Sequence, residues 1–294
     1  LLTPSRSELD LANYSQVKDW FERNRPSVVI LAAAKVGGIA ANSKFPFEFL
    51  LENLKIQNNV IELAFQNNVK RFLFLGSSCI YPKDSIQPIK EEYLLSNYLE
   101  QTNECYAIAK IAGLKLCDSL RKEHGFDAFS VMPTNLYGPG DNYNTELSHV
   151  LPALIKKISL AKKFSEENVS CWGTGNPLRE FLHVDDLARA CIFLLEKWDP
   201  SLNLDPKYSK QNYLTYLNIG SGEEVSIKEL ATKIAEILDY KGKILWDRTK
   251  PDGTFQKRLD ISRIKELGWS HEINLKSGLI RTINEFQSNY FKDS

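Results

Sequence analysis

The chain contains 294 residues, and its 37 lysines and arginines are balanced by 37 aspartates and glutamates. This length accommodates a large α/β domain with a smaller second lobe. The balanced charge excludes a general electrostatic attraction to nucleic acid or to an anionic membrane surface, so we expect neither partner. No apolar run approaches the roughly 18 residues that a membrane span requires, and no basic-then-apolar leader opens the chain.

Cysteine usage indicates the compartment. The number of cysteines is odd and none forms a Cys-x-x-Cys pair, which argues against a disulfide framework and a zinc knuckle. The cysteines are Cys79, Cys105, Cys117, Cys171 and Cys191. We therefore expect a cytoplasmic protein without a metal site.

The first predicted unit is a strand, a helix and a second strand. The apolar run VVILAAA at 28–34 and the run RFLFL at 71–75 are typical of parallel strands covered on both faces. Between them, residues 47–68 carry apolar side chains at nearly helical spacing. This order predicts a right-handed crossover unit.

Later segments continue the alternation. A long helix is predicted from about Tyr106 to His124, closed by Gly125, and a strand follows at 128–132. Further helices are expected at about 149–163 and 185–197, a strand at 216–219, and a helix that the capping box of Ser226 and Glu229 opens. The pattern predicts a Rossmann-like, doubly wound parallel α/β fold.

We divide the chain into two domains on this basis. Residues 1–147 and about 180–219 should form the nucleotide-binding domain, and about 148–179 with 220–294 a smaller substrate domain. Such a fold normally opens with a strand and a glycine-rich turn. The chain has no such segment, because Gly37 and Gly38 follow a later strand at the wrong spacing. We therefore expect a fragment that lacks about 30 residues at its front.

A group of three residues points to hydride-transfer chemistry. Tyr106 and Lys110 are four residues apart on a predicted helix and so project from one face. A lysine cation near a phenol should lower the tyrosine pKa, so that the tyrosine can donate a proton to a carbonyl. Ser77 follows a strand end, where α/β sheets place their ligand crevice. Tyr-x-x-x-Lys spacing by itself is also typical of a solvated helix pair.

Several motifs together resemble the GDP-L-fucose synthase family, an extended short-chain dehydrogenase/reductase family of GDP-4-keto-6-deoxy-mannose 3,5-epimerase-4-reductases. They occur in order over nearly the whole chain: AAAKVGGI at 32–39, GSSCIYP at 76–82, YAIAK at 106–110, MPTNLYGP at 132–139, SHV at 148–150, REFLHVDD at 179–186 and KPDGT at 250–254.

The resemblance implies a two-step reaction. A 4-keto group acidifies the C3 and C5 protons, so that an acid-base pair can invert both centres before C4 is reduced. By resemblance, Cys79 and His149 form that pair, while Tyr106, Lys110 and Ser77 serve hydride transfer from NADPH. Cysteine and histidine both titrate near enough to neutrality for this work. Without their motif contexts, Cys79 would be read as a small buried apolar residue and His149 as structural.

The resemblance also implies binding residues. NADP(H) would contact Arg6, Leu11, Ala33, Leu75, Gly76, Ser77, Ser78, Lys110, Pro133, Thr134, Asn135, Leu136 and His149, with Arg6 proposed for the 2'-phosphate. The GDP-sugar would contact Lys157, Trp172, Arg179 and Asp252, which offer cations, an aromatic face and a carboxylate. A homodimer that pairs through the two long helices is expected.

Three other functions are compatible with the same fold. A dehydratase of the same fold would carry a glutamate where this chain has Cys79, and a UDP-hexose 4-epimerase is the other close relative. A non-catalytic NADP(H)-binding protein is disfavoured by the intact Ser77, Tyr106 and Lys110. His183 before Asp185 and Asp186 imitates a metal cluster, but the strand-to-helix context predicts an aspartate N-cap and a structural histidine.

Overall fold

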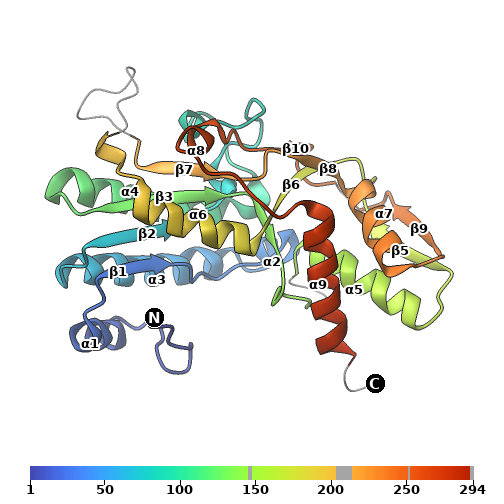
Figure 1. Ribbon diagram of the computed structural model, residues 1–294, viewed down its shortest axis with the longest axis horizontal. Helices are drawn as coiled ribbons and strands as arrows, with labels where there is room; N and C mark the ends of the chain where they lie inside the picture. Colours follow the sequence, from blue (N-terminus) through green and yellow to red (C-terminus); the bar gives the residue numbers. More distant parts are fainter. Residues whose placement is uncertain (145–147, 203–213, 251, 292–294) are drawn as a thin grey trace.

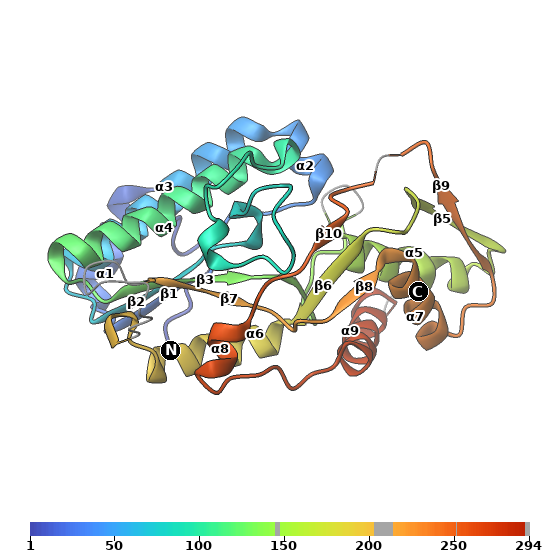
Figure 2. The ribbon, with the colours of Figure 1, turned by 90° about the horizontal axis from the view of Figure 1, so that it is seen from above.

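The computed structural model describes residues 1–144, 148–202, 214–250 and 252–291. The larger lobe is built on a parallel sheet with strand order β1-β2-β3-β7, made of β1 (Val28–Leu31), β2 (Arg71–Leu75), β3 (Ala128–Pro133) and β7 (Tyr216–Ile219). Helices α3 (Pro46–Gln66) and α4 (Glu104–His124) lie on one face, and α6 (Val184–Lys197) lies on the other (Figure 2). This is the doubly wound arrangement that the alternating pattern predicts.

The core of this lobe explains why the runs form strands. All residues of β3 are buried, and Phe72, Leu73 and Phe74 of β2 are 1% exposed or less. Burial of these side chains from water on both faces is the main force that holds the layers together. Helix α1 (Tyr14–Asn24) packs Val17 and Phe21 against the same core.

Helices α3 and α4 approach each other closely because one position has no side chain. A Cβ atom at Gly113 of α4 would lie 2.5 Å from Cζ of Phe74 and 3.0 Å from Cδ of Gln57. The Gln57 side chain in turn donates a hydrogen bond of 2.6 Å to the carbonyl oxygen of Ala109. Helix α4 ends at Gly125, which has a left-handed φ of 69°, as the sequence predicted.

The smaller lobe lies at the other end of the molecule (Figure 1). A sheet of β4 (Asn135–Tyr137), β6 (Leu178–His183), β8 (Glu224–Ser226) and β10 (Gln256–Lys257) joins the lobes, and β5 (Asn168–Trp172) pairs with β9 (Lys243–Asp247) beyond it. Helices α5 (Val150–Lys163), α7 (Ile227–Leu238) and α9 (Leu275–Tyr290) enclose a second core. The short helices α2 (Ile39–Lys44), α8 (Ser262–Glu266), η1 (Ser78–Ile80), η2 (Glu91–Tyr93), η3 (Gln101–Asn103) and η4 (Pro200–Leu202) complete the elements.

Glu180 fastens the joining sheet to the loops beside it. Its side chain is fully buried, and its two carboxylate oxygens accept hydrogen bonds from the backbone N–H groups of Gly222 (2.7 Å) and Leu259 (2.8 Å). The Thr134 hydroxyl donates to its carbonyl oxygen over 3.2 Å. One residue therefore fixes segments that are far apart in the sequence.

Most predicted elements are confirmed within one to three residues at their ends, including the capping box at Ser226 and Glu229. Two expectations are wrong. Strand β1 is not covered on both faces, because Val28 and Ile30 are 47% and 45% exposed, and β1 pairs only with β2 among the described residues. The N-cap of α6 is His183 itself, whose Nδ1 accepts from the backbone N–H of Asp185 over 3.2 Å.

The aspartates after His183 have other roles. Asp186 is fully buried and accepts hydrogen bonds from the backbone N–H groups of Glu272 (2.9 Å) and Ile273 (3.0 Å). It therefore anchors the segment before α9. Among the described residues, no group of three His, Cys, Asp or Glu side chains is arranged to hold a metal ion. None of the helices in the described part of the chain combines the length and apolar character needed to cross a membrane.

Candidate active site

The first part of the site is the turn after β2. Gly76 is buried against Met132, so closely that a Cβ atom would lie 2.4 Å from the Met132 sulfur. Ser77 then caps η1, with its Oγ accepting a hydrogen bond of 3.2 Å from the Cys79 backbone N–H. The turn thus places the hydroxyl of Ser77 and the thiol of Cys79 at the carboxyl end of the sheet, where ligands of doubly wound folds bind.

Helix α4 brings Tyr106 and Lys110 to the same place. The Tyr106 hydroxyl is hydrogen-bonded to the Ser77 side chain. The Lys110 ammonium donates to the carbonyl oxygen of Leu75 over 2.8 Å, lies 4.8 Å from the centre of the Phe74 ring, and is 5.9 Å from the centre of the Tyr106 ring. The three residues predicted for hydride transfer therefore form one cluster.

The electrostatics of this cluster differ from the prediction. Burial raises the pKa of Tyr106, with the nearby Cys79 adding to the rise and the Ser77 hydrogen bond opposing it. Burial also lowers the pKa of Lys110 to about 8. The expectation that Lys110 lowers the pKa of Tyr106 is wrong, because the ammonium is directed to a backbone carbonyl and both groups are desolvated.

Two hydrogen-bond donors meet at the sulfur of Cys79. The Asn103 side-chain Nδ2 lies 3.4 Å from Sγ, and the Lys257 ammonium lies 3.5 Å from it. Neither Asn103 nor Lys257 belongs to a motif recognised in the sequence. Asn103 immediately precedes α4 and resembles an ordinary helix-capping residue. Lys257 comes near Cys79 only because β10 pairs with β6, which no short motif reveals.

His149 precedes α5 and lies near the same lysine. His149 keeps an exposed face. The protein atoms around its imidazole lower the pKa of His149 by desolvation, and the Lys257 cation lowers this pKa further. Lys257 thus acts electrostatically on His149 and contacts Cys79. The two residues predicted for proton transfer therefore both interact with one cation.

The predicted sugar-nucleotide residues gather beside this centre. Trp172 is 62% exposed, with the ammonium groups of Lys157 and Lys250 at 5.9 Å and 5.6 Å from its ring centre. Arg179 interacts electrostatically with both Asp252 and Cys79, and burial lowers its pKa. The surface therefore combines an aromatic face with cations, as a nucleoside diphosphate requires. Lys250 was missing from the predicted set.

The Asp252 carboxylate is hydrogen-bonded within the protein. Its carboxylate accepts hydrogen bonds from the Thr174 backbone N–H (2.9 Å) and hydroxyl (2.7 Å). These bonds hold residues 252–254 against Gly173. The carboxylate therefore shapes this rim of the site and keeps its charge close to Arg179.

The predicted cofactor residues form two groups. Leu75, Gly76, Ser77, Ser78, Lys110, Ala33, Pro133, Thr134, Asn135 and Leu136 lie in or near the carboxyl ends of β1, β2 and β3. Ser78 and Thr134 are buried as whole residues, at 3% and 4% exposed. Arg6 is exposed, and Leu11 packs at the edge of the core near α1 while its carbonyl oxygen accepts from Asn59 over 2.9 Å.

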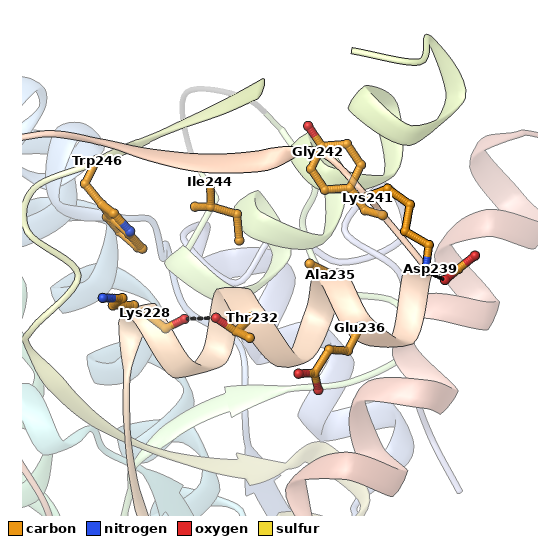
Figure 3. A pocket seen from close by; sticks show the side chains of 10 residues that line it. Lys228, Thr232, Ala235, Glu236, Asp239, Lys241, Gly242, Ile244 and Trp246 are labelled. Carbon is orange, nitrogen blue, oxygen red and sulfur yellow. Dashed lines mark hydrogen bonds and ion pairs between the residues drawn. The ribbon is translucent and has the colours of Figure 1, made fainter. Parts of the chain in front are cut away.

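A groove between α7 and β9 is separate from this site (Figure 3). Its floor includes Thr232, whose hydroxyl donates to the carbonyl oxygen of Lys228 over 3.0 Å, and its wall includes Ile244 and Trp246. None of the residues predicted to be catalytic or to bind ligands lines it. The residues predicted to be catalytic lie elsewhere, around the strand ends of the larger lobe.

Comparison with known proteins agrees with this geometry. Residues 3–204 match the NAD dependent epimerase/dehydratase family. The chain is 51% identical to GDP-L-fucose synthase 1 of Arabidopsis thaliana over 98% of its own length and 85% of the relative's, and 48% identical to GDP-L-fucose synthase of Escherichia coli strain K12 over 98% and 89%. A gdp-l-fucose synthetase from Naegleria fowleri bound to NADP superposes with a TM-score of 0.84 at 27% identity, covering 99% of this chain and 86% of that one. Given this similarity, the chain belongs to the NAD dependent epimerase/dehydratase family and, within it, to the GDP-L-fucose synthases.

Proposed function

We propose that the protein converts GDP-4-keto-6-deoxy-D-mannose into GDP-L-fucose in two steps, epimerisation at C3 and C5 followed by reduction of the C4 carbonyl with NADPH. The observation that carries the proposal is the position of Cys79 two residues after Ser77, in electrostatic contact with Tyr106. A plain reductase needs only the tyrosine and the serine. A thiol at the same strand end supplies the second acid-base group that epimerisation requires.

Epimerisation is assigned to Cys79 and His149. The C4 carbonyl acidifies the protons on C3 and C5, so that a base can take each proton while the electron pair moves onto the carbonyl oxygen. An acid on the opposite face then returns a proton to carbon and the carbonyl re-forms. Two acid-base groups that both interact with Lys257 suit this exchange, and each is assigned to one face of the ring.

Reduction is assigned to Tyr106 with Ser77 and Lys110. When bound, NADPH supplies the hydride. Ser77 and Tyr106 hold the carbonyl oxygen by hydrogen bonds, and Tyr106 donates the proton that completes the alcohol. A phenol whose pKa is raised stays protonated at neutral pH, which suits this donor role. Lys110 lies at the buried end of the cluster, with its ammonium donating to the carbonyl oxygen of Leu75, and is assigned to the nicotinamide half of the cofactor.

The donor set is suited to a nicotinamide cofactor. The ammonium of Lys110 uses one of its three donors on Leu75 and is otherwise surrounded by apolar and aromatic groups, so a ligand hydroxyl would satisfy the remaining donors. The small side chain of Ala33 leaves room at the end of β1. The exposed Arg6 is assigned to the 2'-phosphate of the adenosine half.

The remaining assignments follow from the same family membership. Trp172, Lys157 and Arg179 bind the GDP portion, with Asp252 at the rim. Residues 1–147 and about 180–219 form the cofactor domain, and about 148–179 with 220–294 form the substrate domain. The protein works in the cytoplasm as a homodimer that pairs through α3 and α4, since Phe47 and Ile108 of these helices are 72% and 44% exposed.

Isotope exchange tests the proposal. The protein is incubated with NADPH and GDP-4-keto-6-deoxy-D-mannose in deuterated water, and the product is examined by NMR and mass spectrometry. We expect GDP-L-fucose with deuterium at C3 and C5, because both protons pass through solvent-exchanging groups. A reduced product without deuterium at either carbon would exclude the epimerase activity and leave a simple 4-reductase.

A further inference from the structure

The backbone around Lys257 is held rigidly next to Cys79. Lys257 pairs with Arg179 in the β10–β6 ladder. The backbone N–H of Arg258 donates to the Gln87 side chain over 2.9 Å, and that of Leu259 donates to the buried carboxylate of Glu180 over 2.8 Å. The ammonium of Lys257 therefore approaches the sulfur from a fixed strand rather than from a flexible loop.

Among the described residues, both hydrogen-bond partners of the Cys79 sulfur are donors. A lysine ammonium has three donors and no lone pair, and the amide nitrogen of Asn103 is likewise only a donor. Both are directed at Sγ, at 3.5 Å and 3.4 Å. The sulfur is therefore the acceptor of both bonds, and a thiolate accepts such bonds more strongly than a neutral thiol.

The charge of Lys257 is not neutralised by a carboxylate. Within the described part of the chain, none of the salt bridges involves Lys257. The other ionisable groups that face Cys79 are Tyr106 and Arg179, and the group that faces Lys257 from α5 is His149. Two cations and a neutral phenol thus surround the sulfur.

We propose that Lys257 is a positioning residue for epimerisation: its ammonium, with Asn103 as second donor, holds the sulfur of Cys79 in the position from which it removes a proton from the sugar. In the step it serves, the C–H bond of the substrate breaks, an S–H bond forms, and the C–H electron pair moves onto the C4 carbonyl oxygen. The inference rests on the proposed role of Cys79 in the reaction.

The cation also acts on the second member of the acid-base pair. It disfavours the positive form of His149, whose pKa it lowers. Removal of the charge should therefore move the limb of the pH profile of deuterium exchange that reports His149 to higher pH. A residue that merely supported the fold would lower the rate without moving that limb.

Alkylation of Cys79 tests the contact without substrate or cofactor. The full chain is treated with iodoacetamide from pH 5 to pH 10, and the modified Cys79 peptide is quantified by mass spectrometry for the wild type, Lys257→Met, Lys257→Gln and Lys257→Arg. Lys241→Met is the matched control, because Lys241 is exposed and pairs with Asp239 on the far side of the smaller lobe.

We expect Lys257→Met and Lys257→Gln to slow alkylation at pH 7 by about tenfold, because the sulfur loses the cation that holds it. Lys257→Arg and Lys241→Met should react like the wild type. Wild-type alkylation in both neutral variants would overturn the proposal. If Cys79→Ser instead keeps normal deuterium exchange, the catalytic role of Cys79 fails while the measured coupling to Lys257 stands, so the two failures are distinguishable.

Discussion

The ammonium of Lys110 donates a hydrogen bond of 2.8 Å to the carbonyl oxygen of Leu75, the last residue of β2. This bond ties the catalytic helix α4 to the strand whose end carries Ser77 and Cys79. The Lys110 ammonium is buried. Among the described residues, the carbonyl oxygen of Leu75 and the aromatic rings of Phe74 and Tyr106 replace the water that would otherwise solvate it. Burial of this charge should affect the free energy of unfolding in a way that depends on pH.

Lys110→Met should change how stability depends on pH. The folded pKa of about 8 lies below the ordinary lysine value of 10.5, so the unfolded chain binds more protons between these values. The buried charge therefore costs stability below pH 8, and the cost disappears as pH rises from about 8 to 10.5. Its full size is about 3 kcal/mol by the linkage relation.

Urea unfolding of the unliganded protein at pH 7, 8, 9 and 10 checks this prediction. The difference in unfolding free energy between the wild type and Lys110→Met should move in favour of the wild type with rising pH. A difference that stays constant across the series would show that Lys110 is not held with a lowered pKa. Saturating NADPH should reduce the effect if the cofactor engages the ammonium.

Cys79→Ser should separate the two proposed steps. The hydroxyl keeps the size of the side chain but is a far weaker base than a thiol, so deuterium exchange at C3 and C5 should fall by about 100-fold or more. Some reduction of unepimerised substrate should continue through Tyr106. Product analysis in deuterated water is the measurement, and normal exchange in the variant would remove Cys79 from the acid-base pair.

Tyr106→Phe should have the opposite effect. Loss of the phenol removes the proton donor for the C4 oxygen, so NADPH oxidation should slow by about 100-fold or more. Deuterium should still enter recovered substrate, because Cys79 and His149 remain. If exchange falls as steeply as reduction, the tyrosine serves both steps and the division of labour is wrong.

Gly113→Ala should loosen the contact between α3 and α4. The added Cβ would lie 2.5 Å from the buried ring of Phe74, and overpacking of this kind costs about 1–3 kcal/mol although alanine favours helices. Ser119→Ala, on an exposed turn of the same helix, is the control and should stay within about 0.5 kcal/mol of the wild type. Thermal unfolding of both variants decides the question.

Glu180→Gln should destabilise the joining sheet. One carboxylate oxygen becomes an amide that faces the N–H of either Gly222 or Leu259, which leaves buried donors unpaired at about 1–3 kcal/mol. Because Leu259 fixes the strand of Lys257, alkylation of Cys79 should also slow. Glu236→Gln on the exposed face of α7 controls for charge removal. A variant as stable as this control would contradict the anchoring role.

The sequence predicted the elements whose signal is local. The spacing of apolar residues identified α3, Gly125 marked the end of α4, and Ser226 with Glu229 marked the start of α7. Each depends on residues within about two turns of one another, so their chemistry is readable from neighbours. The cluster of Ser77, Tyr106 and Lys110 was likewise predicted, because strand end and helix start adjoin in this fold.

The other features of the site could not be predicted, because they depend on contacts between residues that are far apart in the sequence. Lys257 lies 178 residues after Cys79, and only the register of β10 against β6 brings them together. The choice of His183 as N-cap depends on Asp186 being used elsewhere, by Glu272 and Ile273. The direction of the Lys110 ammonium depends on burial, which a four-residue spacing does not encode. These are properties of packing rather than of motifs.

Strand β1 has a practical consequence for work with this chain. Val28 and Ile30 present β-branched side chains to solvent, and β2 is the only neighbour of the strand among the described residues. An uncovered strand of this kind is a template on which the same strand of another molecule can add by backbone hydrogen bonds. In a doubly wound sheet a further strand pairs at this edge and its crossover helix covers the face, so a longer chain with such a strand would shield Val28 and Ile30.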